Sequence, residues 1–184
     1  YLLAWTTTPW TLPGNAALAV GEKVDYVQGE GKGFDGNTEN LILAEARLVT
    51  LKNPESYTVV KRFKGAELVN LRYEPLFDYV PFDEDAWYVI SGDFVSTDDG
   101  TGIVHLAKAF GADDFRTLVQ NNVPGVFVKD EQGKDIPIVD KRGKFITTVG
   151  EFLVEKVLEH GITAHKVYGA DDFYVKNYTE DDEH

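Results

Sequence analysis

The chain has 184 residues, of which 43% are hydrophobic and 12% aromatic, so it is long enough for one domain with a substantial core. Its 31 acidic and 18 basic residues give a net charge of −13. This charge excludes a general nucleic-acid binder, because such a surface repels phosphates over a Debye length of about 8 Å. The absence of cysteine excludes disulfides, thiolate metal sites and a cysteine nucleophile.

The composition also predicts which kind of chain this is. No apolar run approaches the roughly 20 residues that span a membrane, and no signal segment opens the chain. Methionine is absent even from the first position, where Tyr1 is predicted to lie within a strand. We therefore expect residues 1–184 to be a single domain excised from a longer protein, with the acidic residues 171–184 as an edge of the fragment.

Short runs of β-branched and aromatic residues predict seven strands. In chain order they are residues 1–6, 16–20, 26–29, 57–63, 87–90, 102–106 and 125–128. Gly29, Gly31 and Gly33 form a G-x-G-x-G run that begins at the end of the third of these. Because no helical pattern opens directly on this run, we interpret it as a hairpin tip rather than a phosphate-binding loop.

Apolar spacing predicts three helices, over residues 39–51, 113–121 and 151–160. The second begins with two acidic residues, which favour the positive end of a helix dipole, and Gly161 ends the third. Strands dominate and the helices occur singly among them. This order predicts a mixed α/β, β-rich domain, either a mixed sheet or a β-barrel core with peripheral helices, and not a regular alternating parallel sheet.

The common catalytic sets are missing from the sequence. No H-x-x-x-H pair occurs among the histidines, which are His105, His160, His165 and His184, and no G-x-S-x-G elbow is present. Asp113 and Asp114 are adjacent, so on a helix their side chains point about 100° apart and cannot form a facing carboxylate pair. Any hydrolysis would have to activate water by positioning and hydrogen bonds, which suits only a labile bond.

Two segments are unusual. In residues 6–15, three threonines end a strand, Pro9 keeps Thr8 extended, and Pro13 with Gly14 makes a turn. A regular ladder cannot use all the hydroxyls of this bent loop. A strand end with threonine caps and a buried tryptophan is the simpler interpretation, and spacing alone favours it.

The second segment runs from residue 99 to residue 114. It is predicted to be a tight turn, a buried strand ending near His105, a short loop, and a helix that starts with Asp113 and Asp114. On pattern alone, His105 is a core histidine with satisfied ring nitrogens, and the acidic pair compensates the helix dipole.

These two segments resemble a known family. WTTTPWTLPGN, residues 5–15, and GTGIVHLAKAFGADDF, residues 100–115, are similar to signatures of the editing domain inserted in isoleucyl-tRNA synthetase, a class I aminoacyl-tRNA synthetase. LRYEPLF, residues 71–77, resembles a segment between them. The leucyl and valyl relatives typically have arginine where Thr8 stands, which favours the isoleucyl family. The resemblance implies a β-barrel core decorated with helices.

The resemblance also implies an activity. The inserted domain hydrolyses the ester of valine wrongly attached to the isoleucine tRNA, because one missing methylene gives only about 1–3 kcal/mol of discrimination, a magnitude for which isoleucyl-tRNA synthetase is itself the standard example. The motifs that activate the amino acid are absent, so this domain is expected to use no cofactor, although the parent enzyme uses ATP and Mg. The expected partners are the acceptor end of tRNA(Ile) carrying valine and the remaining domains of a monomeric, cytoplasmic, non-membrane parent.

Roles carry over position by position. Asp114 resembles the carboxylate that holds the α-ammonium of the aminoacyl group, and His105 resembles the histidine that limits the size of the side chain. The other predicted site residues match hydroxyls that contact the terminal adenosine or position the water, a pocket wall, and an asparagine implicated in editing; they are Thr6, Thr7, Thr8, Thr11, Trp10 and Asn15. No metal ligands are predicted. A site without a catalytic triad or a metal suffices for this hydrolysis, because the ammonium group of the aminoacyl ester activates the ester and the vicinal ribose hydroxyl assists.

Lys108 departs from the family, which usually has proline in the loop after the histidine; the substitution predicts a positive charge near the pocket. Two alternatives to the isoleucyl editing domain stay open. One is a recognition module that holds the tRNA end without hydrolysis. The other is the editing domain of the valyl or leucyl relative, against which Thr8 and the following Pro-Trp-Thr argue.

Overall fold

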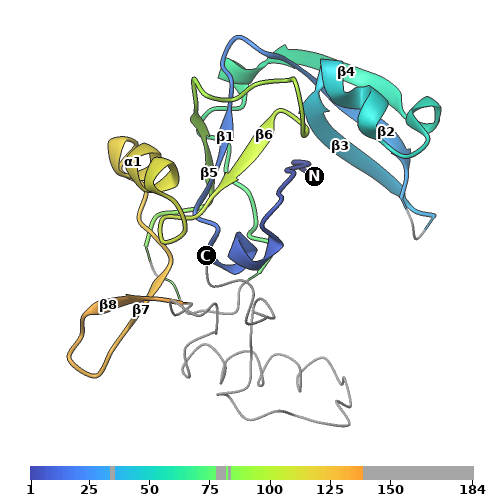
Figure 1. The fold of residues 1–184 in the computed structure, drawn as a ribbon. Helices are drawn as coiled ribbons and strands as arrows, with labels where there is room; N and C mark the ends of the chain where they lie inside the picture. The colour runs from blue at the N-terminus through green and yellow to red at the C-terminus, as the bar shows by residue number, and fades with distance from the viewer. Residues whose placement is uncertain (34–35, 78–81, 83, 139–184) are drawn as a thin grey trace, which may run out of the picture.

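The computed structural model describes residues 1–33, 36–77, 82 and 84–138, with only the backbone at Pro9 and Trp10. Its central sheet has the strand β1 (Ala17–Val20) between β5 (Tyr88–Ser91) and β6 (Ile103–Leu106). β1 pairs with β5 in parallel and with β6 in the antiparallel sense (Figure 1).

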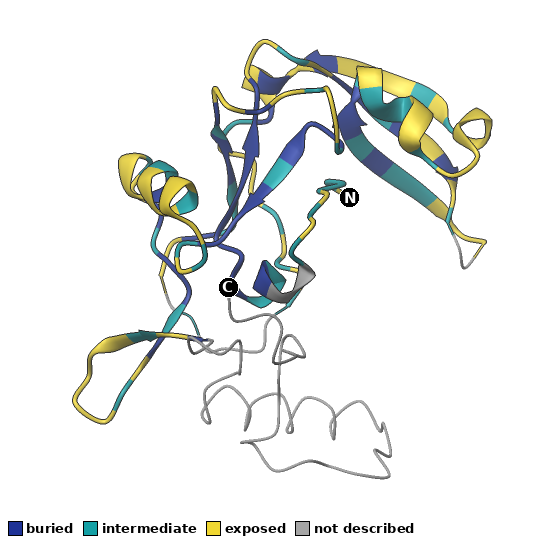
Figure 2. Cartoon of the chain, in the orientation of Figure 1, coloured by how far each residue is buried: buried dark blue, intermediate teal, exposed yellow. Residues whose placement is uncertain are grey.

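Both faces of the central sheet are covered, which explains why β1 is an uninterrupted apolar run. All four residues of β1 are buried (Figure 2). Ala17 and Ala19 pack in one cluster with Leu118, while Leu18 and Val20 pack in a second cluster with Tyr26 of the neighbouring sheet. The side-chain alternation of a strand thus divides β1 between two cores.

The second sheet is antiparallel, with β2 (Asp25–Lys32) between β3 (Thr38–Ala44) and β4 (Thr58–Lys64). The helix predicted over residues 39–51 is wrong in its first half, which forms the strand β3 instead. Leu41 and Leu43 are buried and alternate with half-buried residues, which is the period of a strand. Only the second half of the predicted segment is helical, as the 3-10 helix η2 (Glu45–Thr50).

The glycine run belongs to the hairpin between β2 and β3, as predicted, but only Gly33 lies in the turn. Gly29 and Gly31 lie within β2. The ring of Tyr57 packs over Gly31 so closely that a Cβ at that position would be 2.4 Å from the ring. Close packing, and not a loop conformation, therefore requires glycine at position 31.

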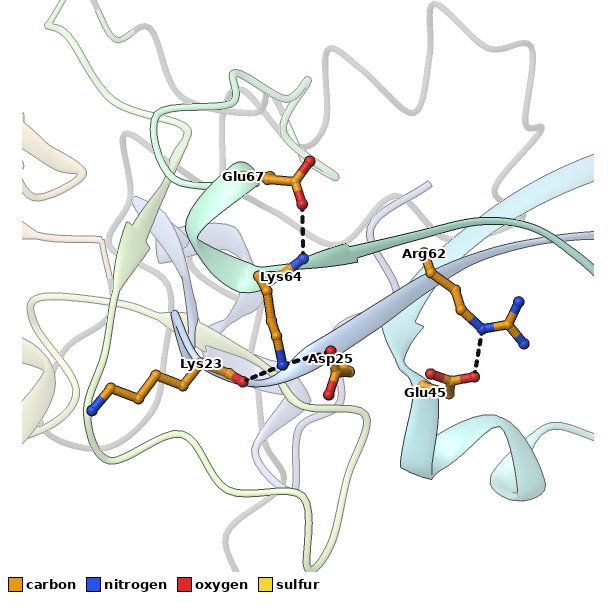
Figure 3. Close-up of polar contacts among 6 residues, drawn as sticks. All are labelled: Lys23, Asp25, Glu45, Arg62, Lys64 and Glu67. Carbon is orange, nitrogen blue, oxygen red and sulfur yellow. Dashed lines mark hydrogen bonds and ion pairs between the residues drawn. The ribbon is translucent and has the colours of Figure 1, made fainter.

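β4 is an edge strand with charged residues along it (Figure 3). Lys64 pairs with Asp25 at 2.7 Å, and Arg62 pairs with Glu45 at 2.8 Å. The 3-10 helix η4 (Gly65–Glu67) follows, and the Glu67 carboxylate accepts a hydrogen bond from the Lys64 N–H at 2.9 Å. Exposed pairs of this kind add about 0–1 kcal/mol each, and charged side chains along an edge strand disfavour its pairing with other chains.

The remaining elements are shorter. They are the 3-10 helices η1 (Pro9–Gly14) and η3 (Pro54–Ser56), the helix α1 (Ala112–Gln120), and the hairpin of β7 (Phe127–Lys129) and β8 (Asp135–Pro137). α1 confirms the helix predicted over residues 113–121, whereas β8 was not predicted. The predicted helix 151–160 and the acidic end 171–184 lie outside the described residues.

The prediction of a first strand over residues 1–6 is wrong. This segment makes only isolated bridges, from Leu2 to Ile42 and from Trp5 to Val104, so it touches both larger sheets without extending either. The Ala44 N–H also donates to the Thr101 carbonyl at 2.9 Å and joins the sheets directly.

The described residues form three separate sheets, of three, three and two strands, and no closed barrel. The expected mixed, β-rich class is confirmed, and the expected barrel is not. Within the same residues, no helix has the length and hydrophobicity needed to cross a membrane.

Candidate active site

The threonine-rich segment folds into the 3-10 helix η1, in place of the turn predicted at Pro13 and Gly14. Thr8 has φ −126° and ψ 64°, so it is not in the extended conformation expected before a proline, and its carbonyl accepts the Thr11 N–H at 3.0 Å. The helix ends where the Asn15 N–H donates to the Leu12 carbonyl at 3.0 Å. These turns place Thr11 and Asn15 beside β6.

His105, on β6, joins these two residues through its ring. Nε2 lies 2.8 Å from the Thr11 hydroxyl, and Nδ1 lies 3.2 Å from the Asn15 side-chain nitrogen. All three side chains are buried. Residues about 90 positions apart in the sequence therefore meet in one hydrogen-bonded cluster.

The partners determine which nitrogen of His105 carries the proton. The amide nitrogen of Asn15 can only donate, so Nδ1 must accept. The Thr11 hydroxyl already donates to the Thr8 carbonyl at 2.8 Å, so it accepts from Nε2. His105 is consequently neutral, with its proton on Nε2.

Burial also favours the neutral form of His105. Desolvation of the ring lowers the pKa of His105 to about 4. A protonated ring would also present an N–H at Nδ1 to the donor of Asn15. The imidazole is thus an uncharged part of the wall near neutral pH.

The threonine hydroxyls form a short chain. Thr6 and Thr8 lie 3.2 Å apart, and Thr8 and Thr11 lie 3.3 Å apart, measured between their side-chain oxygens. The Thr8 N–H also donates to the Thr6 hydroxyl at 3.0 Å. Thr7 is exposed, and its hydroxyl has no hydrogen-bond partner among the described residues, so it is free to bind a water or a ligand.

The two acids behave differently. Asp113 is exposed and pairs with Arg116 at 2.6 Å. Asp114 is half-buried and accepts the Ala107 N–H at 2.9 Å. Burial raises the pKa of the Asp114 carboxyl, and no ion pair of this group occurs within the described ranges. Asp114 is therefore a partly desolvated carboxylate with room for a cationic partner.

One cavity of about 440 Å³ brings most of the predicted residues together. Its lining includes six of them, namely Thr6, Thr7, Thr8, Thr11, His105 and Asp114. Asn15 does not line this cavity but supports His105 from behind. The side chain of Trp10 lies outside the described part of the chain, so its predicted place in the wall stays a prediction.

Other cavity residues were missed by the sequence analysis. Trp5, Phe94, Ser96, Asp99 and Phe110 also line the cavity. Phe94 and Ser96 lie outside the two unusual segments, and only the folded chain brings them to the site. Trp5, Asp99 and Phe110 lie within or at the edge of those segments, but no pattern marked them as site residues.

The charge expected near the pocket from Lys108 is not there. Its ammonium points toward the Val123 carbonyl, at 3.5 Å, and lies 5.7 Å from the centre of the Phe115 ring. Lys108 is not part of the cavity lining, because its side chain turns toward the chain that follows α1. Within the described ranges, no group of three or more His, Asp or Glu side chains is placed to hold a metal ion.

Comparison with known proteins identifies sequence relatives. The chain is 41% identical over 180 residues to the isoleucine–tRNA ligase of Cytophaga hutchinsonii, a match that covers 89% of the chain and 16% of that protein. It is 39% identical over 197 residues to the isoleucine–tRNA ligase of Porphyromonas gingivalis, covering 96% and 17%. The chain thus spans about one sixth of the length of these relatives. No family model matches it.

Solved structures with a similar fold are leucyl-tRNA synthetase domains. The cytosolic leucyl-tRNA synthetase editing domain of P. falciparum matches with a TM-score of 0.55 and 14% identity, over 90% of this chain and 61% of that one. GlLeuRS-CP1 matches with a TM-score of 0.52 and 24% identity, over 66% and 45%. The chain is therefore homologous over most of its length to isoleucyl-tRNA synthetase, a class I aminoacyl-tRNA synthetase, and has the fold of a synthetase editing domain.

Proposed function

We propose that this domain edits tRNA(Ile) after transfer, by hydrolysing the ester that joins valine to the terminal ribose. The main observation in support is the 440 Å³ cavity, which gathers the partly desolvated carboxylate of Asp114, the neutral imidazole of His105 and the four threonines of residues 6–11. The homology to isoleucine–tRNA ligases supports tRNA(Ile) as the proposed tRNA and valine as the proposed misattached amino acid.

Asp114 is the proposed partner of the α-ammonium. An aminoacyl ester carries one positive charge, next to the bond that breaks. A carboxylate whose pKa is raised by burial gains from a cation, because the cation offsets the cost of desolvation. Asp113 already has Arg116 and lies in solvent, so it does not compete for this role.

The threonines are the proposed ligands of the terminal adenosine and of the attacking water. Thr7 is exposed with an unbonded hydroxyl among the described residues, and Thr8 lines the cavity wall beside the hydroxyl of Thr11. In the proposed step, the water oxygen bonds to the ester carbonyl carbon and the bond to the ribose oxygen breaks. A water proton passes to that ribose oxygen, which releases valine and leaves a free hydroxyl on the tRNA. Positioning and electrostatic stabilisation supply the catalysis, without a resident cofactor.

His105 is the proposed limit on side-chain size. A site that merely accepted valine would also accept isoleucine, because an added methylene favours apolar binding. Rejection of the correct product therefore needs a rigid surface that the larger side chain strikes. A buried imidazole, hydrogen-bonded at both nitrogens, is such a surface.

The proposed partners are the acceptor end of tRNA(Ile) and the other domains of a parent synthetase, for which we propose ATP and Mg as the cofactors of amino-acid activation. With a net charge of −13, this domain depends on those other domains to bind the phosphates of the tRNA.

Single-turnover deacylation of valyl-tRNA(Ile) by variants of the two acids tests the function. A charge-assisted contact is worth about 1.5–3 kcal/mol, so we expect Asp114→Ala to slow hydrolysis about ten- to a hundredfold. Asp114→Asn keeps an acceptor for the Ala107 N–H and removes only the charge, so it should lose nearly as much. Asp113→Ala is the matched control and should stay near the wild-type rate.

Equal losses in the variants of Asp113 and Asp114 would contradict the assignment of the ammonium to Asp114. A wild-type chain that binds a valyl-adenosine analogue but hydrolyses no ester would instead identify a recognition module without catalysis. Faster hydrolysis of threonyl or norvaline esters than of valyl esters on their own tRNAs would favour the valyl or leucyl relative.

A further inference from the structure

His105 forms part of the wall between two cavities. It lines the site cavity of about 440 Å³ and also a second cavity of about 560 Å³, whose lining includes Asn15, Leu18 and Tyr73. A ring with open space on two sides is not fixed by packing alone. Its orientation depends on the hydrogen bonds that it makes, which go to Thr11 on one side and to Asn15 on the other.

The amide of Asn15 is held in one orientation. Its nitrogen donates to the Ala17 carbonyl at 2.9 Å and lies 3.5 Å from the Leu106 carbonyl, so this end must be the donor. Its oxygen accepts the hydroxyl of Tyr73 at 2.6 Å. Rotation of the amide by 180° would place its oxygen against two carbonyls and its nitrogen against the position of the Tyr73 hydroxyl.

Tyr73 reaches Asn15 from a separately fixed position. Its N–H donates to the Trp87 carbonyl at 3.0 Å. Trp87 is held in turn, since its ring N–H donates to the Asn15 carbonyl at 3.0 Å and its backbone N–H to the Ala16 carbonyl at 2.8 Å. Trp87 has φ +60°, a conformation that a bulky residue keeps only where its surroundings fix it.

We propose that Tyr73 is a positioning residue: its hydroxyl holds the Asn15 amide in the orientation that donates to Nδ1 of His105, and so keeps the His105 proton on Nε2, toward Thr11. The hydrogen-bond direction then runs from Tyr73 through Asn15, His105 and Thr11 to the Thr8 carbonyl. The consequence for substrate choice rests on the proposed function; the placement of the proton does not.

A purely structural role for Tyr73 gives a different expectation. If its hydroxyl only satisfies a buried amide oxygen, removing it lowers stability and leaves the tautomer of His105 unchanged. The state of the two ring nitrogens therefore distinguishes the two roles.

The test is a nitrogen-15 NMR spectrum of the histidine rings in the 184-residue chain at neutral pH, with His105 assigned by the signals lost in His105→Gln. In the wild type we expect Nε2 to be protonated and Nδ1 unprotonated. In Tyr73→Phe we expect the Nδ1 signal to shift toward the protonated type as the second tautomer becomes populated. Tyr57→Phe, which removes a hydroxyl bonded to Glu39 in the other sheet, should match the wild type.

The same variants give a functional readout. Loss of one neutral hydrogen bond corresponds to about three- to tenfold, so the ratio of valyl-tRNA(Ile) to isoleucyl-tRNA(Ile) deacylation should fall by about that factor in Tyr73→Phe only. If the spectrum changes as expected and the wild type hydrolyses neither ester, Tyr73 still positions His105 and the proposed function is wrong.

A folded Tyr73→Phe protein with the wild-type tautomer would overturn the proposal, and so would a proton on Nδ1 in the wild type. Asn15→Asp provides a second variant if Tyr73→Phe does not fold. Its carboxylate can accept from Tyr73 but cannot donate, so it should convert Nδ1 of His105 to the protonated type; an unchanged Nδ1 would again overturn the proposal.

Discussion

The imidazole of His105 has both nitrogens hydrogen-bonded and no counter-ion among the described residues, so the site favours its neutral form. A buried ring that cannot take a proton without losing a hydrogen bond keeps the same shape and polarity over the working range of pH. Such constancy suits a surface that selects by size. It also affects how the stability of the domain responds to acid.

Acid should remove stability through His105. Burial lowers the folded-state pKa of His105 from 6.5 to about 4, so the unfolded chain binds this proton first as the pH falls. Above pH 6.5, His105 is neutral in both the folded and the unfolded chain and does not lower the free energy of unfolding. As the pH drops from 6.5 toward 4, protonation of the unfolded chain lowers that free energy. From the size of the shift, we expect the wild type to lose on the order of 2–3 kcal/mol more than His105→Gln across this window.

Urea unfolding of both proteins at several pH values measures this difference. Burial raises the pKa of Asp114, which acts in the opposite direction, but both proteins retain that carboxyl and its effect cancels in the comparison. A stability difference between wild type and His105→Gln that does not change with pH would contradict a neutral, desolvated His105.

Among the elements, the segment 39–51 shows why one pattern admits two structures. Leu41, Leu43 and Leu48 satisfy parts of both the helical and the strand period, and the sequence alone does not choose between them. Pairing of β3 with β2 does, because residues 38–44 complete the hairpin that begins with the glycine run. The helix α1 was predictable because its apolar spacing and acidic first turn agree.

The close packing of Tyr57 on β2 gives a prediction for this sheet. A Cβ at Gly31 would lie 2.4 Å from the Tyr57 ring, so we expect Gly31→Ala to lower the free energy of unfolding by about 1–3 kcal/mol. At Gly29 the nearest Tyr57 atom would be 3.6 Å away, so Gly29→Ala should be neutral or slightly stabilising. Urea midpoints that coincide for the two variants would show that the ring moves aside freely.

In the whole molecule, the site combines residues that lie together in short motifs with residues that only the folded chain brings into contact. The threonines and the pair of His105 and Asp114 each lie in one motif, so the resemblance to synthetase editing domains identified them. Tyr73 lies 58 positions from Asn15 and no periodicity links them. Only the parallel pairing of β1 with β5, and the contacts of Trp87 beside it, bring them together.

The net charge of the molecule predicts weak binding to tRNA. A chain with a net charge of −13 gains little from counterion release, so we expect it to bind uncharged tRNA no tighter than about 1 µM at physiological salt. Fluorescence anisotropy with labelled tRNA(Ile) measures the affinity. Whole valyl-tRNA(Ile) should also be hydrolysed little faster than a valyl-minihelix, and submicromolar binding of uncharged tRNA would contradict this account.

In the proposed site, a rigid His105 separates valyl-tRNA(Ile), which is hydrolysed, from isoleucyl-tRNA(Ile), which is not. The most direct test is the ratio of single-turnover deacylation rates for valyl-tRNA(Ile) and isoleucyl-tRNA(Ile), measured for the wild type, His105→Ala and a bulky neutral variant, His105→Gln. We expect His105→Ala still to hydrolyse valyl-tRNA(Ile) and now also to hydrolyse isoleucyl-tRNA(Ile), while His105→Gln retains most of the discrimination. A His105→Ala protein that hydrolyses valyl-tRNA(Ile) but still spares isoleucyl-tRNA(Ile) would contradict the role of His105 as a size limit and make it a core residue.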